Sequence, residues 1–458
     1  MLHLADFACS SMLHTGLRPF IFDISMARFS SLFVLNNNAI LVNQSTRFTN
    51  YLKAAADGSL LAKPPVRPPY VAHMVYHPPM WGILQSSYDD VEAELNTLRN
   101  RHKDKFILFV GGDGLSIMRI NHLLLKFPDL YLDSAPMVVP VQGEAPHGVF
   151  HMMHAGWRLF RKFIRAAADN TLGRDLGRAV VDEPTVKVFN HQLYALWWMT
   201  RACSEYLLML ARSPGGVDID MVPEFRQACE RNVDLAWVFH FLYDFAYLVL
   251  DLKQGVRRND SRHLDLLWRE FLRVGMTGTA NKTHYVPMAI MRVFWAEALN
   301  PEIAAVYHAL RAIPMSKRVY VGWDTPIEWL NGSITDGVKT LVSEQKIENF
   351  VANYSFLSHN YSSLLDEVHV LRGQGTSHMR DMDGNVAAMK HWLCTNIGTT
   401  WAAATRHNHN SRLGIDRRGQ LPWVEMRQSM TRVGRESVVN HVDEVVRRLT
   451  RSFYRFAP

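Results

Sequence analysis

The chain has 458 residues, of which 48% are hydrophobic and 20% are charged, and its formal net charge is +7. This composition is typical of a packed globular protein and argues against an intrinsically disordered chain, while the length predicts two or three structural units. The mild basicity permits a polyanionic partner, above all nucleic acid, without requiring one.

The cysteines indicate a reducing compartment. Four are present, and no two of them form a CxxC pair: Cys9, Cys203, Cys229 and Cys394. Such scattered cysteines argue against a cysteine zinc site and a disulfide framework, and indicate buried thiols in an intracellular protein.

Neither a secretory leader nor a membrane segment is expected. The first residues, MLHLADFACSSMLH, have no basic start and no continuous apolar core. The most apolar run, residues 235–250, contains His240 and Asp244 and is shorter than a bilayer span, so it predicts a buried helix. We therefore expect an intracellular chain without a membrane partner, nuclear if the organism is eukaryotic.

The beginning of the chain alternates short β-like runs with turns. Residues 20–24 predict a strand, and residues 31–43 predict a hairpin around three asparagines. A proline-rich connector over 63–69 precedes two further strand-like runs, 70–76 and 81–85.

A parallel strand–helix–strand unit follows. Ser87 is suited to cap a helix that begins after it. The continuous apolar run 106–110 is typical of a strand covered on both faces. A helical pattern over 115–127 and an apolar run over 136–141 complete the unit, which predicts that its two strands are parallel.

The later part of the chain is predicted to be helical. The hydrophobic period changes to 3.6 residues after about residue 150. We therefore expect three zones: an α/β part over residues 1–150, a helical block over 151–320, and C-terminal helices with a basic tail over 321–458.

Two groups of side chains in these helical zones could contact nucleic acid. Stacking on bases is one role for four tryptophans, although their helical spacing favours the core: Trp197, Trp198, Trp268 and Trp295. The tail has four arginines on one helix side that form either a phosphate-binding stripe or a solvated face: Arg447, Arg448, Arg451 and Arg455.

Asp113 is the main candidate for a functional carboxylate. It lies between glycines at the end of the predicted strand 106–110, and ligands gather at the carboxyl ends of parallel strands. The flanking glycines would let a ligand approach the backbone closely. The alternative is that Asp113 only caps the helix that begins near Leu115.

The turn GGDG resembles the nucleotide motif of NAD kinases and diacylglycerol-type lipid kinases, whose glycine-rich turn faces ATP. Those families continue with a glycine-rich β domain, whereas this chain continues with Trp-rich helices and has no Walker lysine. A nucleotide-binding, kinase-like protein remains one alternative.

A longer stretch carries a second resemblance. The segments VGGDGLSIMRINHLLLKFPDLYLDSAPMVVPVQGEAPHGVFHMMHAGW and WDTPIEWLNG resemble a transposon-derived family of unknown function, over about residues 106–356. The resemblance implies a helix-dominated protein with an α/β core, a ribonuclease H-like mixed sheet interrupted by a large all-helical insertion. It also implies a transposase-derived protein that binds DNA and cleaves or transfers its strands.

The resemblance also implies the acidic site. Asp113 and Glu328 would hold Mg²⁺ or Mn²⁺, because metal ions between carboxylates can clamp the attacking and leaving oxygens of a phosphodiester. Asp23 would be the third acid, but its surroundings lack the family's DN motif. An incomplete triad leaves a second alternative, a catalytically inactive, domesticated protein that binds nucleic acid or acts as a scaffold.

Further residues are candidates for accessory roles. The resemblance places Asp324 and Asn331 beside Glu328, where Asp324 could replace or support it. Glu328 has a purely structural alternative, a capping box with Thr325. Glu144 precedes the histidines of the same site.

Three histidines, His147, His151 and His154, are spaced i, i+4 and i+7. They could bind a metal or form a polar seam, and the resemblance implies that His147 or His151 orients a phosphate or water. Pro146 and Gly148 predict a turn around His147, which would leave two of the three on the helix.

Overall fold

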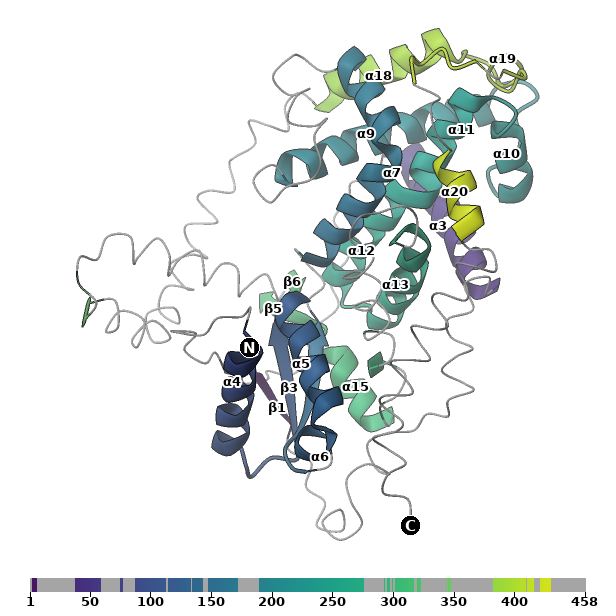
Figure 1. Cartoon of the computed structure of the whole chain (residues 1–458). Coiled ribbons are helices and arrows are strands. Elements are labelled where there is room, and N and C mark those ends of the chain that lie inside the picture. The colour runs from purple at the N-terminus through teal and green to yellow at the C-terminus, as the bar shows by residue number, and fades with distance from the viewer. Residues whose placement is uncertain are drawn as a thin grey trace.

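The computed structural model describes fifteen main stretches and a few isolated residues, and all structural statements below concern them: 2–5, 38–58, 75–76, 87–112, 114–132, 134–142, 147–171, 189–275, 295–296, 301–316, 319–322, 345–346, 382–408, 410–415 and 421–429, with 292, 299 and 343. Over these residues the protein is helix-dominated and has a small sheet. Figure 1 shows a body of packed helices next to a smaller part that contains the sheet.

The larger sheet has the strand order β2-β1-β3-β4. Its strands are β1 (Leu2–Ala5), β2 (Val75–Tyr76), β3 (Ile107–Gly112) and β4 (Met137–Gln142). β1 pairs antiparallel with both β2 and β3, whereas β3 and β4 are parallel, from Ile107 opposite Met137 to Gly112 opposite Gln142. The predicted parallel pair is therefore confirmed.

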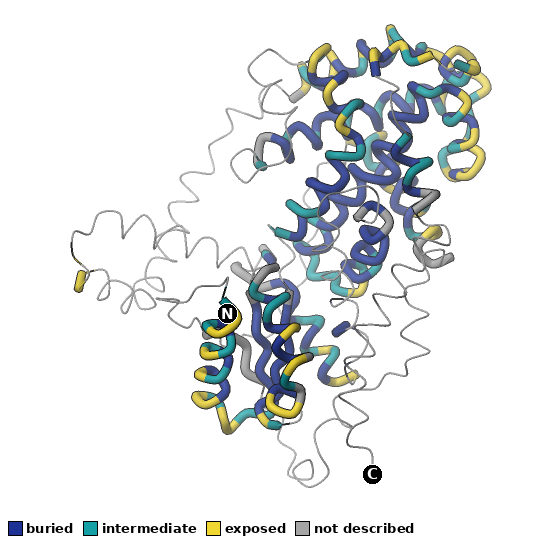
Figure 2. Tube along the Cα trace, viewed as in Figure 1, coloured by how far each residue is buried: buried dark blue, intermediate teal, exposed yellow. Residues whose placement is uncertain are grey.

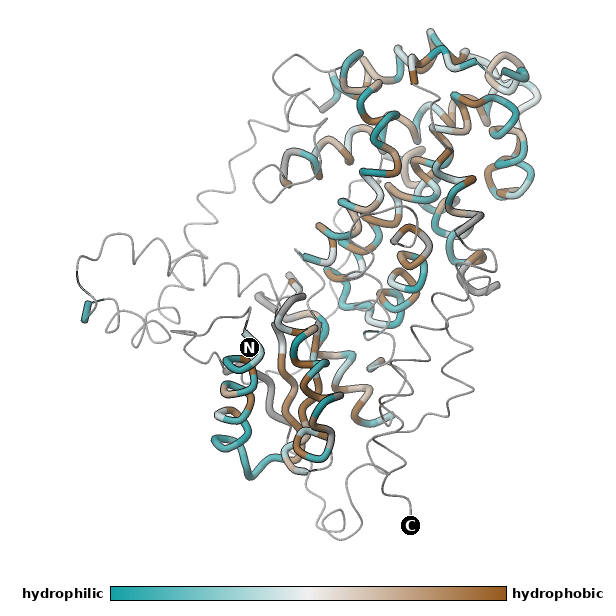
Figure 3. Tube along the Cα trace, in the orientation of Figure 1, coloured by the Kyte–Doolittle hydropathy of each residue, from teal (hydrophilic) through white to brown (hydrophobic). Residues whose placement is uncertain are grey.

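The helices beside this sheet form where the sequence predicts them. α4 (Tyr88–Arg101) is capped by the Ser87 hydroxyl, which accepts a hydrogen bond from the Asp90 amide at 3.3 Å. α5 (Gly114–Lys126) connects β3 to the short helix α6 (Pro128–Tyr131) and then to β4. Both faces of β3 are covered, since the four residues of the apolar run that lie in the strand are buried: Ile107, Leu108, Phe109 and Val110. Figure 3 shows these strands as the most hydrophobic part of the sheet region.

The helical body and a small hairpin make up the rest of the described chain. The helices are α3 (Asn38–Ala56), α7 (His147–Thr171), α9 (Phe189–Ala211), α10 (Val222–Cys229), α11 (Val233–His240), α12 (Tyr247–Arg258), α13 (Ser261–Gly275), α15 (Pro301–Ala309), α18 (Met382–Asn396), α19 (Trp401–Ala404) and α20 (Pro422–Ser429). The hairpin is formed by β5 (Ala312–Ser316) and β6 (Val319–Gly322). The helices bury their inner faces against one another (Figure 2).

The apolar run 235–250 is a buried helix, as predicted. α11 continues through the π-helical segment η3 (Phe241–Ala246) into α12, and Asn259 ends the run in a left-handed conformation with φ of 50°. Among the described residues, this run is the one helix long and apolar enough to cross a membrane, and 94% of its most apolar window is buried within the protein. Core helices of globular proteins share this property.

The predicted hairpin over residues 31–43 is wrong in its second half, and residues 31–37 lie outside the described part. Residues from Asn38 onward form α3. Its buried positions follow helical spacing and pack against α9, α13 and η3: Gln44, Arg47, Phe48, Tyr51 and Leu52. Burial of this face against distant helices decides the structure over the local β-like composition.

The tryptophans and cysteines that the structure describes are mainly core residues. Trp198, Trp268 and Trp295 are 1% exposed, which confirms the core prediction for these three. Trp197 is partly buried, and its ring lies 4.8 Å from the Lys253 ammonium. Cys203 and Cys229 are free and buried, Cys394 is free and half-buried, and Cys9 lies outside the described residues.

Candidate functional site

The candidate site is the edge of the sheet at the carboxyl ends of β3 and β4. Gly112 lies opposite Gln142 at the last position of the parallel ladder. α5 begins at Gly114, and α7 begins at His147. Each of the two adjacent strand ends is thus followed closely by a helix N-terminus, where backbone N–H groups and the helix dipole favour anions.

The carboxylates predicted for this site lie outside the described residues: Asp23, Asp113, Glu144, Asp324 and Glu328, together with Asn331. The neighbours of Asp113 are described and have the expected form, because β3 ends at Gly112 and α5 begins at Gly114. The strand and the helix predicted on the two sides of this position are therefore both present.

The described strand nearest in sequence to Asp324 and Glu328 is β6, which ends at Gly322. β6 packs against α12, and α12 packs against α7, the helix that starts next to the sheet edge. In the view of Figure 1, β5 and β6 are drawn at the end of the sheet opposite α6, which is the end where α5 begins.

All three histidines are on one helix, so the turn predicted around His147 is wrong. α7 begins at His147, since proline is well tolerated directly before or at the first helical position. The rings of His147 and His151 have their centroids 6.5 Å apart, and His154 is buried and stacks on Phe150 at 6.1 Å. No group of three His, Cys, Asp or Glu side chains within the described ranges is arranged to hold a metal ion.

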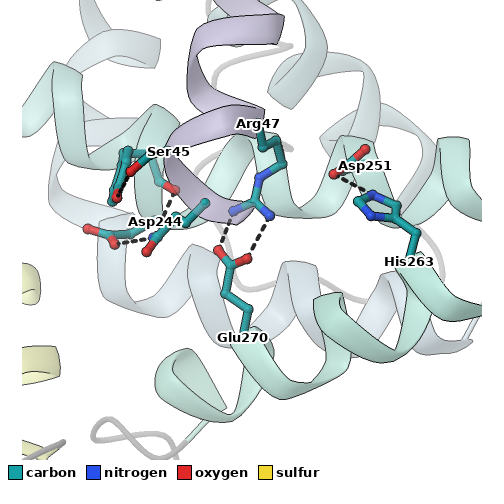
Figure 4. A network of polar contacts seen from close by, with 8 residues as sticks. Ser45, Arg47, Asp244, Asp251, His263 and Glu270 are labelled. Atoms are coloured by element: carbon teal, nitrogen blue, oxygen red, sulfur yellow. Dashed lines mark hydrogen bonds and ion pairs between the residues drawn. The ribbon is translucent and has the colours of Figure 1, made fainter. Parts of the chain in front are cut away.

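A second concentration of polar groups lies in the helical body, and the sequence prediction did not identify it. Figure 4 shows α3 facing η3, α12 and α13 through buried polar contacts. The Arg47 guanidinium forms a two-pronged ion pair with Glu270, one bond of which is 2.6 Å long. Asp251 accepts hydrogen bonds from the Tyr51 hydroxyl at 3.2 Å and from His263 Nε2 at 2.8 Å.

The same network continues through η3. Asp244 accepts a bond from Gln44 Nε2 at 3.0 Å and contacts His240 Nδ1 at 2.6 Å. His240 Nε2 contacts Glu230 at 2.9 Å, and Glu230 also accepts a bond of 2.9 Å from Arg226. A sequence signal existed, because His240 and Asp244 interrupt an apolar helix four residues apart and therefore share one face.

Charges in this network shift the pKa values of its members. Burial alone would raise the pKa of Glu230, but hydrogen bonds from His240 and Arg226 outweigh it and lower the pKa from 4.5 to about 2. Burial would lower the pKa of His263, but the bond to Asp251 outweighs it and raises the pKa. The network thus connects α3 to the helical body through buried ion pairs and hydrogen bonds.

One lysine at the margin of this body also has a shifted pKa. Burial, with a smaller contribution from the nearby Arg257, lowers the pKa of Lys253 from 10.5 to about 8. Its ammonium faces the Trp197 ring.

Comparisons of the chain with protein-family models, with curated proteins and with solved structures gave no match.

Proposed function

We propose that the chain is a transposase-derived, DNA-binding protein whose α/β part is a ribonuclease H-like core. Its sheet edge would hold Mg²⁺ or Mn²⁺ through Asp113 and Glu328. The observation that carries the proposal is the parallel pairing of Gly112 with Gln142. This pairing supports a ligand site directly after Gly112, because ligands of parallel sheets bind beyond the carboxyl ends of the strands.

The chemistry of the residues around this edge supports phosphodiester binding. Carboxylate oxygens are the ligands that Mg²⁺ prefers. When bound, the ion would polarise a phosphodiester and stabilise the charge that develops on its oxygens. His147 and His151, on the first two turns of α7, would position a phosphate or a water next to it.

Asp23 is proposed as the third acid, and its participation separates two forms of the proposal. A chain in which Asp23 completes the site would cleave DNA. A chain in which it does not would bind DNA without cleaving it, which is the inactive, domesticated form.

The test is a nicking assay on supercoiled DNA with Mg²⁺ or Mn²⁺. The Asp113→Asn variant removes the proposed ligand charge with little change in shape. Asp104→Asn is a matched control, because Asp104 is exposed in the turn at the amino end of β3. We expect Asp113→Asn to lose on the order of 10²-fold or more in rate, a typical loss for removal of one transition-state-stabilising group, and Asp104→Asn to keep it.

The other outcomes are equally informative. Equal nicking by both variants would remove Asp113 from the site. DNA binding without nicking in the natural chain would leave the inactive form. Thermal stabilisation by ATP, lost in Gly112→Val, would replace the proposal with the nucleotide-binding alternative.

A further inference from the structure

One face of α7 carries a row of basic side chains that starts at the candidate site. We name it the basic stripe, and its members are His147, His151, Arg158, Arg161, Lys162 and Arg165, whereas His154 in the same sector is buried. At 3.6 residues per turn these positions fall within a sector about 100° wide. With a rise of 1.5 Å per residue, the stripe is about 27 Å long.

The opposite face of α7 is fixed in the core. Trp157, Phe160, Phe163 and Ile164 are fully buried there. Arg161 and Arg165 are exposed, while Arg158 and Lys162 are half-buried. The helix therefore offers Arg161 and Arg165 to the solvent, and its apolar face is used in the core and cannot insert into a lipid surface.

Little negative charge on α7 offsets the stripe. The helix has one acid, Asp169, which lies 3.8 Å from Arg165, and both side chains are more than 60% exposed. An exposed pair of this kind contributes little and exchanges readily for another anion. The sequence of α7 thus contains four permanent cations and one carboxylate, Asp169, which lies at the end of the helix farther from the sheet edge.

A row of cations along one helix face suits an extended polyanion better than a single small anion. DNA is such a polyanion, with one phosphate per roughly 3.4 Å of helix axis on each strand. Arginine and lysine are the usual contacts to phosphate oxygens. The exposed arginines lie at the far turns of α7, and the half-buried His147 and His151 lie at the near turns next to the sheet edge.

We propose that the basic stripe binds the sugar–phosphate backbone of DNA and leads it to the carboxyl ends of β3 and β4. The inference rests on the proposed function, of which it identifies the DNA-holding surface. In this proposal α7 binds the DNA backbone and does not recognise the base sequence.

The test is the salt dependence of binding of the full chain to a labelled duplex, followed by fluorescence anisotropy. Arg161→Gln/Arg165→Gln removes two exposed charges of the stripe. Arg101→Gln/Lys103→Gln is the matched control, because these residues are also exposed and lie near the amino end of β3. We expect the stripe variant to bind at least about tenfold more weakly, and the slope of log K against log salt to fall in magnitude by about 1.8.

The control should keep both affinity and slope. Equal slopes for the two double variants, in a chain that binds DNA, would overturn the inference alone. If the stripe variant lost binding to phosphatidylserine vesicles but kept its DNA binding, the inference would also be overturned, in favour of a lipid surface. The stripe variant keeps Asp113 and Glu328, so the salt slope tests the stripe while the nicking assay with Asp113→Asn tests the metal site separately. A natural chain that binds no DNA would overturn both proposals.

Discussion

Arg47 of α3 and Glu270 of α13 form an ion pair across 223 positions of sequence, and both side chains are 2% exposed. Burial would lower the pKa of Arg47, but Glu270 raises it above its usual value, so the guanidinium remains charged. Together with Asp251 and Asp244, the pair fixes α3 in the helical body (Figure 4).

Removal of one partner of this pair should be strongly destabilising. Arg47→Met leaves the Glu270 carboxylate buried without its cation, and we expect a loss of about 3–5 kcal/mol in the free energy of unfolding. Denaturation of the natural chain and of Arg47→Met in guanidinium chloride measures this difference in the free energy of unfolding.

The double variant Arg47→Met/Glu270→Leu should recover most of this loss, because apolar side chains of similar volume often replace a buried pair at little cost. A double variant that is as unstable as the sum of the two single variants would contradict a direct coupling.

The contrast between α3 and the βαβ unit shows which information a sequence contains. Ser87, the run 106–110 and the run 136–141 are local signals, and each predicts its element without knowledge of the rest. α3 depends on partners far along the chain, and nothing within residues 31–43 reveals them. Its local apolar residues therefore suggested strands.

The candidate site was predictable to a similar extent. The end of β3 next to Asp113 follows from its local pattern, and the structure agrees at Gly112 and Gly114. The start of α7 was misplaced because Pro146 and Gly148 suggest a turn, whereas proline also suits a helix start. The π-helical segment η3 has no local sequence signature of this kind.

The ring of His263 should make stability depend on pH near neutrality. Asp251 raises the pKa of His263 in the folded protein above 6.5, the usual histidine pKa in an unfolded chain. The protonated ring therefore makes its full contribution to the free energy of unfolding below about pH 6.5. The contribution is lost as the pH rises through the raised pKa. We expect the free energy of unfolding to fall over this interval.

Urea denaturation between pH 6 and 9 measures this dependence. The slope should be smaller in His263→Gln, which cannot titrate. A nuclear magnetic resonance titration that gives His263 a pKa below 6.5 would contradict the assigned pair.

Glu230 should give a second dependence, at acidic pH. Its pKa is lowered from 4.5 to about 2, so its stabilising contribution is present above about pH 4.5 and is lost as the pH falls toward 2. Glu230→Gln should therefore lose less stability between pH 4.5 and 2 than the natural chain. Thermal unfolding followed by circular dichroism would measure this, with Glu224→Gln as a control on the exposed side of α10. An identical acid profile for the two variants would rule out the contribution of Glu230.

Gly156 should tolerate no side chain, because α7 crosses η3 there at close range. A Cβ at this position would lie 2.0 Å from Phe245 Cδ2, whereas at Gly255 the nearest atom is Leu264 Cδ2 at 2.8 Å. In a helix interior, alanine is normally about 1 kcal/mol better than glycine. At Gly156 this gain is reversed by overpacking, which costs about 1–3 kcal/mol or more.

We therefore expect Gly156→Ala to lower the melting temperature clearly, and Gly255→Ala to change it little, since the tip of Leu264 can turn away. Phe245→Leu should partly restore Gly156→Ala, because it removes the ring that the new methyl group meets. Equal melting temperatures for the natural chain and Gly156→Ala would show that α7 and η3 are farther apart than this contact requires.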